Sequence, residues 1–295
     1  MTVHGRTVEL AQVERAAGAR PKITAFRKVD TEGADADALV ALRRQYRLDR
    51  RRVTTLLPPG AYQIQLVEAP NVPEAELKTA IRWKLKDVLD YPPEQATVDV
   101  LPLPMGHVPA GRPRQMFAVS ARNDQVSARM RVFEAARVPL VCIDVPELAQ
   151  RNVATLFEEA GRSLALLAFN EYGGILTITA GGELLLARSL DVPLSQLEVQ
   201  GDGAAGLFER VGLELQRSLD HFDRQFGGLQ VGRLLLAPFR GMQALQRFLA
   251  DNLYLPVEVL DLGGVLDFDG VTELATPEAQ GRSLQLLGAA LRDAA

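Results

Sequence analysis

The residue types that could do chemistry are few in this chain, and their spacing supports no catalytic or metal site. Its three histidines, His4, His107 and His221, lie far apart, and none has metal-ligand spacing with another histidine or with the lone cysteine. Asp220 and Asp223 flank His221, which is ordinary for a charged helix surface and only remotely a general-base arrangement. We therefore predict no catalytic residue and no metal ion.

The common enzyme motifs are also missing. The sequence contains no Walker A loop, no HExxH, no G-x-S-x-G and no pair of cysteines. Its single cysteine, Cys142, lies in the apolar run PLVCIDV, which favours a buried structural thiol over a nucleophile. A disulfide framework is excluded because one cysteine cannot form it.

Composition bounds the size and the partners of the protein. A length of 295 residues predicts two domains of roughly 150 residues each. The net charge of −4 gives no global attraction to nucleic acid, and no basic stripe is interleaved with aromatic residues, so we expect no nucleic-acid partner. The densest basic run, RRQYRLDRRR from Arg43 to Arg52, is typical of a solvated face, with contact to anionic lipid head groups as the alternative.

No segment predicts a membrane span. The longest apolar runs, such as Leu164 to Phe169, fall well short of the roughly 20 residues that a spanning helix needs. No signal peptide precedes them. We expect a soluble, cytoplasmic protein.

The segment from Leu57 to Val100 is organised like a docking module. Tyr62, Ile64 and Leu66 alternate with Gln63, Gln65 and Val67, which predicts a strand. A helix follows from Leu77 to Tyr91, with Glu74 and Glu76 at its start and Pro92 and Pro93 after its end. Its predicted buried face consists of Leu77, Ile81, Leu85, Val88 and Leu89.

Trp83 lies on the other side of this helix. Its neighbours there are Ala80, Lys86, Asp87 and Asp90. The indole is therefore covered either by another subdomain or by a partner protein, and the sequence leaves both interpretations open.

This segment also carries a family resemblance. The pattern EAPNVPEAELKTAIRWKLKDVLDYPPEQATVDV resembles the type IV pilus assembly protein PilM family, and more closely its MSHA biogenesis branch, MshI. Three further stretches agree in the same order: VSARNDQV and IDVPELAQRN within Phe117 to Asn152, ELQRSLDHF at Glu214 to Phe222, and LLGAALR at Leu286 to Arg292. The resemblance implies an α/β, two-domain actin-like (ASKHA) fold with an inserted FtsA/PilM-type subdomain.

The elements predicted elsewhere form two similar halves. Apolar alternation predicts a meander in each half, with strands at 7–12 and 22–28 in the first and at 163–169, 175–179 and 183–188 in the second. Alternating helices and strands follow, with helices predicted at 36–46, 124–136, 147–159, 204–226, 242–253 and 283–292, and strands at 52–57, 115–120, 140–144, 231–237 and 256–260. With the resemblance, this organisation implies domains at 1–160 and 161–295, with an inserted subdomain at about 31–114.

Actin-like ATPases hold ATP with two hairpin loops and a third, glycine-rich segment, each of which the resemblance places in this chain. The first loop offers Gly5 with no preceding aspartate. The second places Ala168, Phe169 and Asn170 where an acid and a glycine belong. Glu171 is then its only acid, and Gly173-Gly174 forms a plain turn.

The third segment places Ala237, Pro238 and Phe239 where the family carries glycines, and only Gly241 remains. Proline and phenylalanine crowd the space that a purine would use. The resemblance therefore implies a degenerate nucleotide site, a pseudo-ATPase and no bound cofactor. An active ATP- and Mg²⁺-binding protein that switches or polymerises is the alternative.

The resemblance also implies the partner. PilM-like proteins lie at the cytoplasmic face of the inner membrane and bind the N-terminal cytoplasmic peptide of a PilN-like protein, which is MshJ-like in the MSHA system. We expect this peptide beside the inserted subdomain, at Trp83, Tyr62, Ile64, Leu66, Lys86, Asp87 and Tyr91. A pilus assembly ATPase is a further candidate partner. The remaining alternative is the cytoplasmic domain of a GspL-like type II secretion protein.

Overall fold

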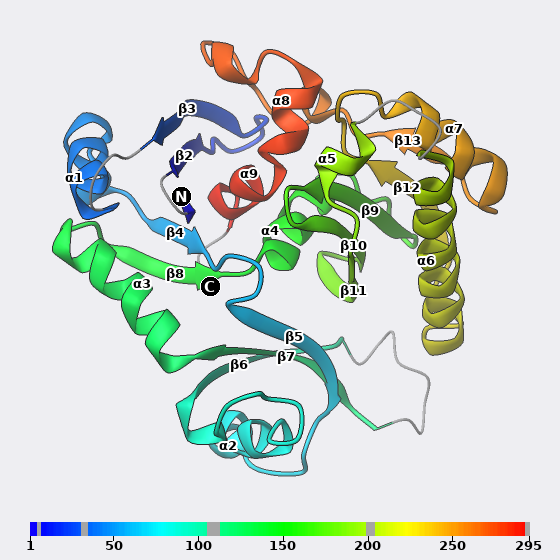
Figure 1. Cartoon of the computed structure of the whole chain (residues 1–295), viewed down its shortest axis with the longest axis horizontal. Helices are drawn as coiled ribbons and strands as arrows, with labels where there is room; N and C mark the ends of the chain where they lie inside the picture. Colours follow the sequence, from blue (N-terminus) through cyan, green and yellow to red (C-terminus); the bar gives the residue numbers. More distant parts are fainter. Residues whose placement is uncertain (5–6, 31–34, 105–112, 199–203, 293–295) are drawn as a thin grey trace. The chain divides into compact units, whose positions relative to one another are not determined.

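The computed structural model describes residues 1–4, 7–30, 35–104, 113–198 and 204–292 (Figure 1). The chain divides into two units. Unit 1 contains Met1, Glu9–Lys28 and Pro146–Ala295, and unit 2 contains Thr2–Val8 and Val29–Val145. The chain passes from unit 2 to unit 1 after Val145, which is 15 residues before the domain boundary expected at residue 160. The domain limits stay a prediction.

Unit 1 is built on a five-stranded sheet in the order β11-β10-β9-β12-β13. The predicted second meander is confirmed as β9 (Ser163–Asn170), β10 (Gly173–Ala180) and β11 (Glu183–Leu190), which pair antiparallel. β12 (Val231–Leu236) joins β9 in parallel, and β13 (Val257–Val259) joins β12. Every residue of β10 is buried, which explains why this strand reads as a nearly continuous apolar run.

Several helices belong to unit 1. They are α4 (Pro146–Ala154), α5 (Leu194–Leu197), α6 (Ala204–Gln225), α7 (Gln243–Asn252), α8 (Pro277–Arg282) and α9 (Leu284–Ala290), with short 3-10 turns η4 (Leu262–Gly264) and η5 (Thr272–Leu274). The longest, α6, buries the predicted stripe at Val211, Leu215 and Phe222, and the half-buried Phe208 packs on Phe248 of α7 with ring centroids 6.0 Å apart.

Helix α4 is buried almost throughout, including polar residues that need partners there. The side chain of Gln150, which is 0% exposed, places Nε2 2.8 Å from the carbonyl of Leu166, 3.0 Å from that of Ile175 and 3.1 Å from the hydroxyl of Thr177. Asn152 donates to the carbonyl of Gly288 in α9 at 3.0 Å. These bonds tie α4 to the sheet on one side and to α9 on the other.

Gly288 lets α4 and α9 approach backbone to backbone. A Cβ atom at this position would lie 1.9 Å from the carbonyl oxygen of Ala149. Only glycine fits there, which gives a physical reason for the glycine in the LLGAALR stretch.

Unit 2 contains a parallel pair, β4 (Val53–Leu56) with β8 (Leu140–Asp144), and a three-stranded sheet in the order β5-β7-β6. The strands of the latter are β5 (Tyr62–Glu68), β6 (Ala96–Pro102) and β7 (Gln115–Arg122), all antiparallel. The helical elements are α1 (Asp35–Tyr46), α2 (Glu74–Lys84), α3 (Asn123–Ala135), and the 3-10 turns η1 (Leu48–Arg50) and η2 (Pro93–Gln95).

A further sheet has the order β1-β2-β3, with β1 (Thr2–His4), β2 (Thr7–Glu14) and β3 (Lys22–Asp30).

Helix α2 packs on one face of the β5-β7-β6 sheet (Figure 1). Ile81 and Leu85 are fully buried against Val98 of β6 and Met116 and Ala118 of β7. Val67 and Val100 pack around this cluster, as do Leu77, Leu89 and Tyr91 from the α2 side.

Two predicted helix ends are wrong. The helix expected to reach Tyr91 ends at Lys84, because the following turns use shorter bonds such as Lys86 N to Trp83 O and Val88 N to Leu85 O. The change of phase leaves Val88 51% exposed, although we expected it to be buried.

The helix expected to reach residue 159 ends at Ala154. Shorter bonds again follow, from Leu156 N to Val153 O and from Phe157 N to Ala154 O, and they accompany the packing of Leu156 and Phe157 onto the core. In both cases the helix ends before any local stop signal, and apolar residues of the turns that follow pack on a core cluster.

Cys142 lies in the predicted strand but is half-buried, so the expectation of a buried thiol is wrong. Among the described strands only β4 pairs with β8, and the adjacent Val141 is 51% exposed. No helix in the described ranges is both long and apolar enough to cross a bilayer.

Gly288→Ala tests the close approach of α4 and α9. We expect the free energy of unfolding to fall by about 3 kcal/mol, because the added methyl group overlaps the Ala149 carbonyl and forces the helices apart. Chemical denaturation followed by circular dichroism measures the change.

The matched control is Gly206→Ala in α6, where a Cβ atom meets nothing within 4 Å. Alanine should stabilise this helix by about 0.5 kcal/mol. Equal effects of the two substitutions would contradict the packing argument.

Candidate functional site

The predicted strand residues Tyr62, Ile64 and Leu66 share one face of the β5-β7-β6 sheet. The register places Tyr62 opposite Ala121, Ile64 opposite Val119 and Leu66 opposite Phe117. Since Met116 and Ala118 face α2, this apolar face is the one opposite α2. All three side chains on β5 are partly exposed.

The backbone edge of β5 is a second feature of this place. Of the described strands only β7 pairs with β5, so β5 lies at the edge of its sheet. An edge strand presents N–H and C=O groups that an extended chain can pair with. The half-exposed apolar face therefore adjoins a row of hydrogen-bonding groups.

Trp83, Lys86 and Asp87 lie away from that face. Trp83 is 50% exposed on α2, and Lys86 and Asp87 are exposed in the turns that follow it. The predicted residues are thus divided between two surfaces of the module. Lys84 links them, because its ammonium group donates to the carbonyl of Glu68 at 2.9 Å and brings the end of α2 to the end of β5. The sequence analysis missed this residue.

Tyr91 belongs to the module's interior rather than to either surface. Its half-buried ring packs at the α2 cluster, and the guanidinium of Arg122 lies 5.2 Å from the ring centroid. Burial raises the pKa of the Tyr91 phenol, and a hydrogen bond with Ser120 acts in the opposite direction. A structural role accounts for these contacts.

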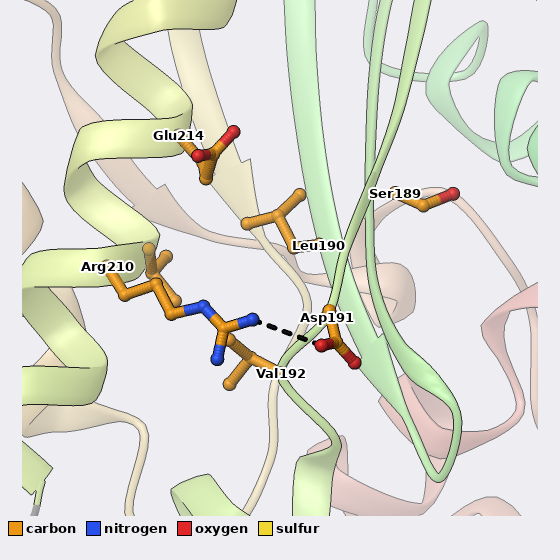
Figure 2. A pocket seen from close by; sticks show the side chains of 7 residues that line it. Ser189, Leu190, Asp191, Val192, Arg210 and Glu214 are labelled. Atoms are coloured by element: carbon orange, nitrogen blue, oxygen red, sulfur yellow. Dashed lines mark hydrogen bonds and ion pairs between the residues drawn. The ribbon is translucent and has the colours of Figure 1, made fainter.

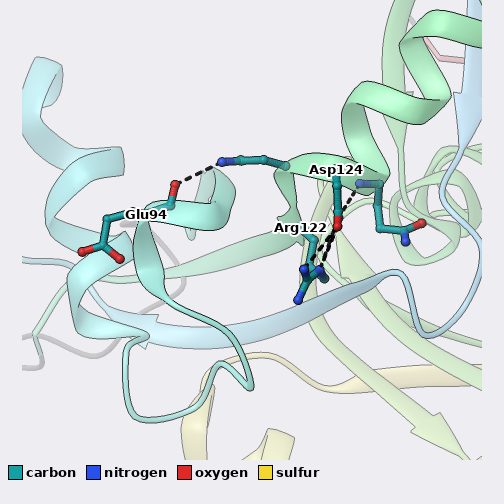
Figure 3. A network of polar contacts seen from close by, with 5 residues as sticks. Glu94, Arg122 and Asp124 are labelled. Atoms are coloured by element: carbon teal, nitrogen blue, oxygen red, sulfur yellow. Dashed lines mark hydrogen bonds and ion pairs between the residues drawn. The ribbon is translucent and has the colours of Figure 1, made fainter.

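Arg122 continues into a polar network at the start of α3 (Figure 3). Its guanidinium lies 3.2 Å from the carboxylate of Asp124, which lowers the pKa of Asp124 and raises that of Arg122. Asn123 donates to the carbonyl of Glu94 at 3.1 Å and so joins the helix start to η2. These exposed contacts position the sheet and helix and create no reactive group.

The residues expected at a second phosphate loop form the β9-β10 hairpin of unit 1. The Asn170 side-chain oxygen accepts hydrogen bonds from the backbone N–H groups of Tyr172 and Gly173, at 2.9 and 3.2 Å. Those N–H groups are therefore already satisfied within the turn. Glu171 is exposed at its tip.

The glycines of this hairpin serve packing. Gly173 has φ 150, and a Cβ atom there would lie 2.4 Å from the carbonyl oxygen of Leu190. A Cβ atom on Gly174 would lie 2.7 Å from the ring of Phe169. Both glycines are needed for the contacts between the strands, irrespective of any ligand.

The third expected segment follows β12. Phe239 is buried and packs edge-on against Phe169, with ring centroids 5.9 Å apart. Gly281 lies against the backbone of Pro238. A Cβ atom on Gly281 would be 2.0 Å from the carbonyl oxygen of Pro238. Gly241 has φ 82 in an open turn. Gly5, from the first loop, lies outside the described residues, as does His107.

The remaining candidates for chemistry do not assemble into a site. His221 on α6 has a lowered pKa because of partial burial and then the nearby charge of Arg188. Asp220 and Asp223 are exposed beside it. Within the described ranges no group of three histidine, cysteine, aspartate or glutamate residues is arranged to hold a metal ion.

A cavity of about 210 Å³ lies between the end of β11 and α6 (Figure 2). Arg210 and Asp191 form an ion pair there at 3.1 Å, and Glu214 also lines it. The pair is largely exposed, and the additional carboxylate disfavours an anionic ligand. This cavity was not anticipated from the sequence.

Solved structures show the same architecture. A chain of the PilM-PilN type IV pilus biogenesis complex matches with a TM-score of 0.71 and 22% identity, over 98% of this chain and 96% of that chain. A Bacteroides thetaiotaomicron protein with the actin-like ATPase fold and unknown function matches with a TM-score of 0.51 and 9% identity, over 90% of each chain.

The chain has the two-domain actin-like ATPase fold. The predicted fold class is thus confirmed. The cytoplasmic domain of EpsL, an inner-membrane component of the type II secretion system of Vibrio cholerae, also matches, with a TM-score of 0.50 and 14% identity over 97% of this chain and 90% of that one. Neither a family model nor a curated protein sequence matches this chain.

Asn170→Ala tests whether the β9-β10 turn depends on its own side chain. We expect a loss of about 1 kcal/mol in the free energy of unfolding, because two backbone N–H groups lose their acceptor. Urea denaturation measures it.

Glu171→Ala, at the exposed tip of the same turn, is the control and should change stability by less than about 0.5 kcal/mol. A larger effect for Glu171 than for Asn170 would show that the acid, and not the amide, organises this loop.

Proposed function

We propose that this protein is a non-catalytic scaffold of a type IV (MSHA-type) pilus assembly platform. It binds the cytoplasmic N-terminal peptide of an inner-membrane partner of the PilN or MshJ-like kind, and this partner holds it at the cytoplasmic face of the membrane. The observation that carries the proposal is the likeness to the PilM-PilN complex along nearly the whole chain. The MSHA assignment rests on the sequence stretches that resemble MshI.

The proposed seat of the peptide is the edge of β5. An extended peptide that adds as a further strand would pair with the edge of β5 that no described strand covers. Its alternate side chains would then lie on Tyr62, Ile64 and Leu66. Trp83 offers a second contact, because Lys84 holds this end of α2 at the Glu68 end of β5.

The proposal includes a pseudo-ATPase. It is supported by the turn in which Asn170 occupies the N–H groups of the second loop, and by the Phe169-Phe239 contact where a glycine-rich segment is expected. A phosphate needs free backbone N–H groups, and a purine needs room beside them. These two features disfavour nucleotide binding. An active ATP-binding protein is accordingly the second candidate, behind the scaffold.

A GspL-like role in type II secretion is the third candidate. The EpsL cytoplasmic domain supports it at the level of the fold, with the lower TM-score of 0.50 against 0.71. The identity of the bound peptide distinguishes the type IV pilus scaffold from the type II secretion protein.

Peptide binding tests the proposed seat. Ile64→Thr keeps a β-branched residue but removes apolar area from the β5 face, and we expect it to weaken binding by about tenfold. Trp83→Ala should weaken it by a similar factor. Calorimetric titration with a synthetic peptide of the partner's cytoplasmic N-terminus gives the affinity, with circular dichroism as the check on folding.

Thr79→Ala, on the exposed surface of α2, is the matched control. An effect of Trp83→Ala alone would move the seat to the outer surface of α2. If the folded Ile64→Thr and Trp83→Ala variants both bind the peptide at full strength, the placement of the peptide is wrong. A peptide with N-methyl groups at alternate positions should lose binding if it pairs as a strand.

Nucleotide binding tests the pseudo-ATPase. We expect ATP or ADP with Mg²⁺ at millimolar concentration to leave the melting temperature unchanged, because a ligand that binds the native state stabilises it by mass action. A clear shift that disappears when magnesium is removed would favour the nucleotide-driven switch instead.

A further inference from the structure

Exposed arginines gather at one end of the β4-β8 pair in unit 2. The two strands are parallel with Val53 opposite Leu140, so the residues that precede them lie at the same end. Helices α1 and α3, which pack together, both end there (Figure 1). We define the arginine corner as Arg44, Arg47, Arg50, Arg51, Arg52 and Arg137, all of which are exposed.

The run that supplies most of the corner contains little opposing charge. Between residues 43 and 52 the chain has six arginines and one acid, Asp49, within a protein whose net charge is −4. The Asp49 carboxylate lies 4.0 Å from Arg50, and both side chains are largely exposed. Within the described ranges Arg47, Arg52 and Arg137 form no ion pair with a carboxylate. A positive patch therefore lies on a mildly acidic protein.

The backbone provides a second, independent observation. Arg47, which follows α1, has φ 51, and Arg137, which follows α3, has φ 52. Of the described residues other than glycine, these two have positive φ. Glycine is the usual residue at this position because an L side chain there is strained.

The geometry after α3 defines this position. Arg137 N donates to Glu134 O at 2.8 Å, and Val138 N donates to Phe133 O at 2.9 Å, which is the Schellman arrangement. The attraction between cations and helix C-termini explains a basic residue in a last turn. It does not explain two arginines at glycine positions or the run at the start of β4. Strain retained at two arginines of one corner points to a use for their charge.

We propose that the arginine corner docks this protein onto an anionic phospholipid bilayer. The guanidinium groups bind head-group phosphates, which their planar, forked donors fit. Each basic residue near such a surface adds attraction, so several exposed arginines together hold the protein there. This inference rests on the proposed function in one respect: a membrane-anchored partner brings the corner to the lipid and raises its effective concentration there.

A lipid surface suits the corner better than nucleic acid does. Binding of single strands uses aromatic platforms for bases, and the aromatic residue here, Tyr46, is half-buried with its hydroxyl shielded. The arginines lie at helix ends, in a 3-10 turn and at a strand start, so their charges are distributed over several elements at one end of the unit. Many shallow phosphate contacts match that arrangement.

Sedimentation with vesicles tests the proposal. The full chain should bind vesicles of equal parts phosphatidylcholine and phosphatidylglycerol, and should not bind vesicles of phosphatidylcholine alone. Binding should decrease as salt is raised. The double variant Arg47→Gly/Arg137→Gly should bind the anionic vesicles about tenfold more weakly. Its melting temperature should rise or stay unchanged, because glycine relieves the strained backbone.

A second double variant, Arg50→Gln/Arg52→Gln, removes the same charge without changing a strained residue and should weaken binding equally. Arg114→Gln/Arg240→Gln removes two exposed arginines elsewhere and is the matched control. Equal loss by control and test variants, or no binding to anionic vesicles, would overturn the proposal. Arginine-dependent binding of duplex DNA without vesicle binding would overturn it in favour of nucleic acid.

Calorimetry with the partner peptide separates this proposal from the proposed function. The corner variants should bind the peptide with unchanged affinity. Peptide binding without arginine-dependent vesicle binding would refute the corner alone. Vesicle binding that depends on the arginines, with no peptide binding, would refute the proposed seat and leave the corner standing.

Discussion

The burial of Gln150 is the constraint on which unit 1 depends. A fully buried amide is tolerated only if its donors and acceptors are satisfied. Here one side chain reaches Leu166 of β9 and both Ile175 and Thr177 of β10, which fixes α4 against the centre of the sheet. Gly288 then allows α9 to lie on the other side of α4 at backbone contact.

The same frame limits what the hairpin between β9 and β10 can do. Its strands are buried except at Asn170 and contact α4, and the Asn170 side chain accepts hydrogen bonds from two backbone N–H groups of the turn. Preorganised N–H groups bind anions only when they are free to donate. The chain thus has the actin-like ATPase fold, and two backbone N–H groups of its second expected loop are occupied within the turn.

Unit 2 carries two surfaces of interest. One is the β5 edge, with backbone groups beside half-exposed apolar side chains. Another is the arginine corner, most of which comes from a run of six arginines with one acid. The proposed peptide seat and the proposed lipid-docking corner therefore use different residues of one unit. Local backbone strain at Arg47 and Arg137 marks the second surface.

The sequence by itself predicted most helices and strands, because apolar periodicity of two or of three to four residues reports which side of an element is buried. Periodicity supported a two-domain α/β organisation, and the resemblance of particular sequence stretches to a known family supplied the actin-like fold class. The stripe of α6 and the second meander follow directly from it. Tertiary structure decided the rest. The helices end at Lys84 and Ala154 without a local stop signal, and Leu89 and Phe157 of the turns that follow pack on the apolar clusters. The sheet register places Ile64 on the face opposite α2, and so on a different surface from Trp83. The parallel pairing of β4 with β8 brings Arg137 beside the arginine run that ends some 85 residues earlier, at Arg52. Neither arrangement could be predicted from the sequence, because contacts between distant residues leave no local pattern.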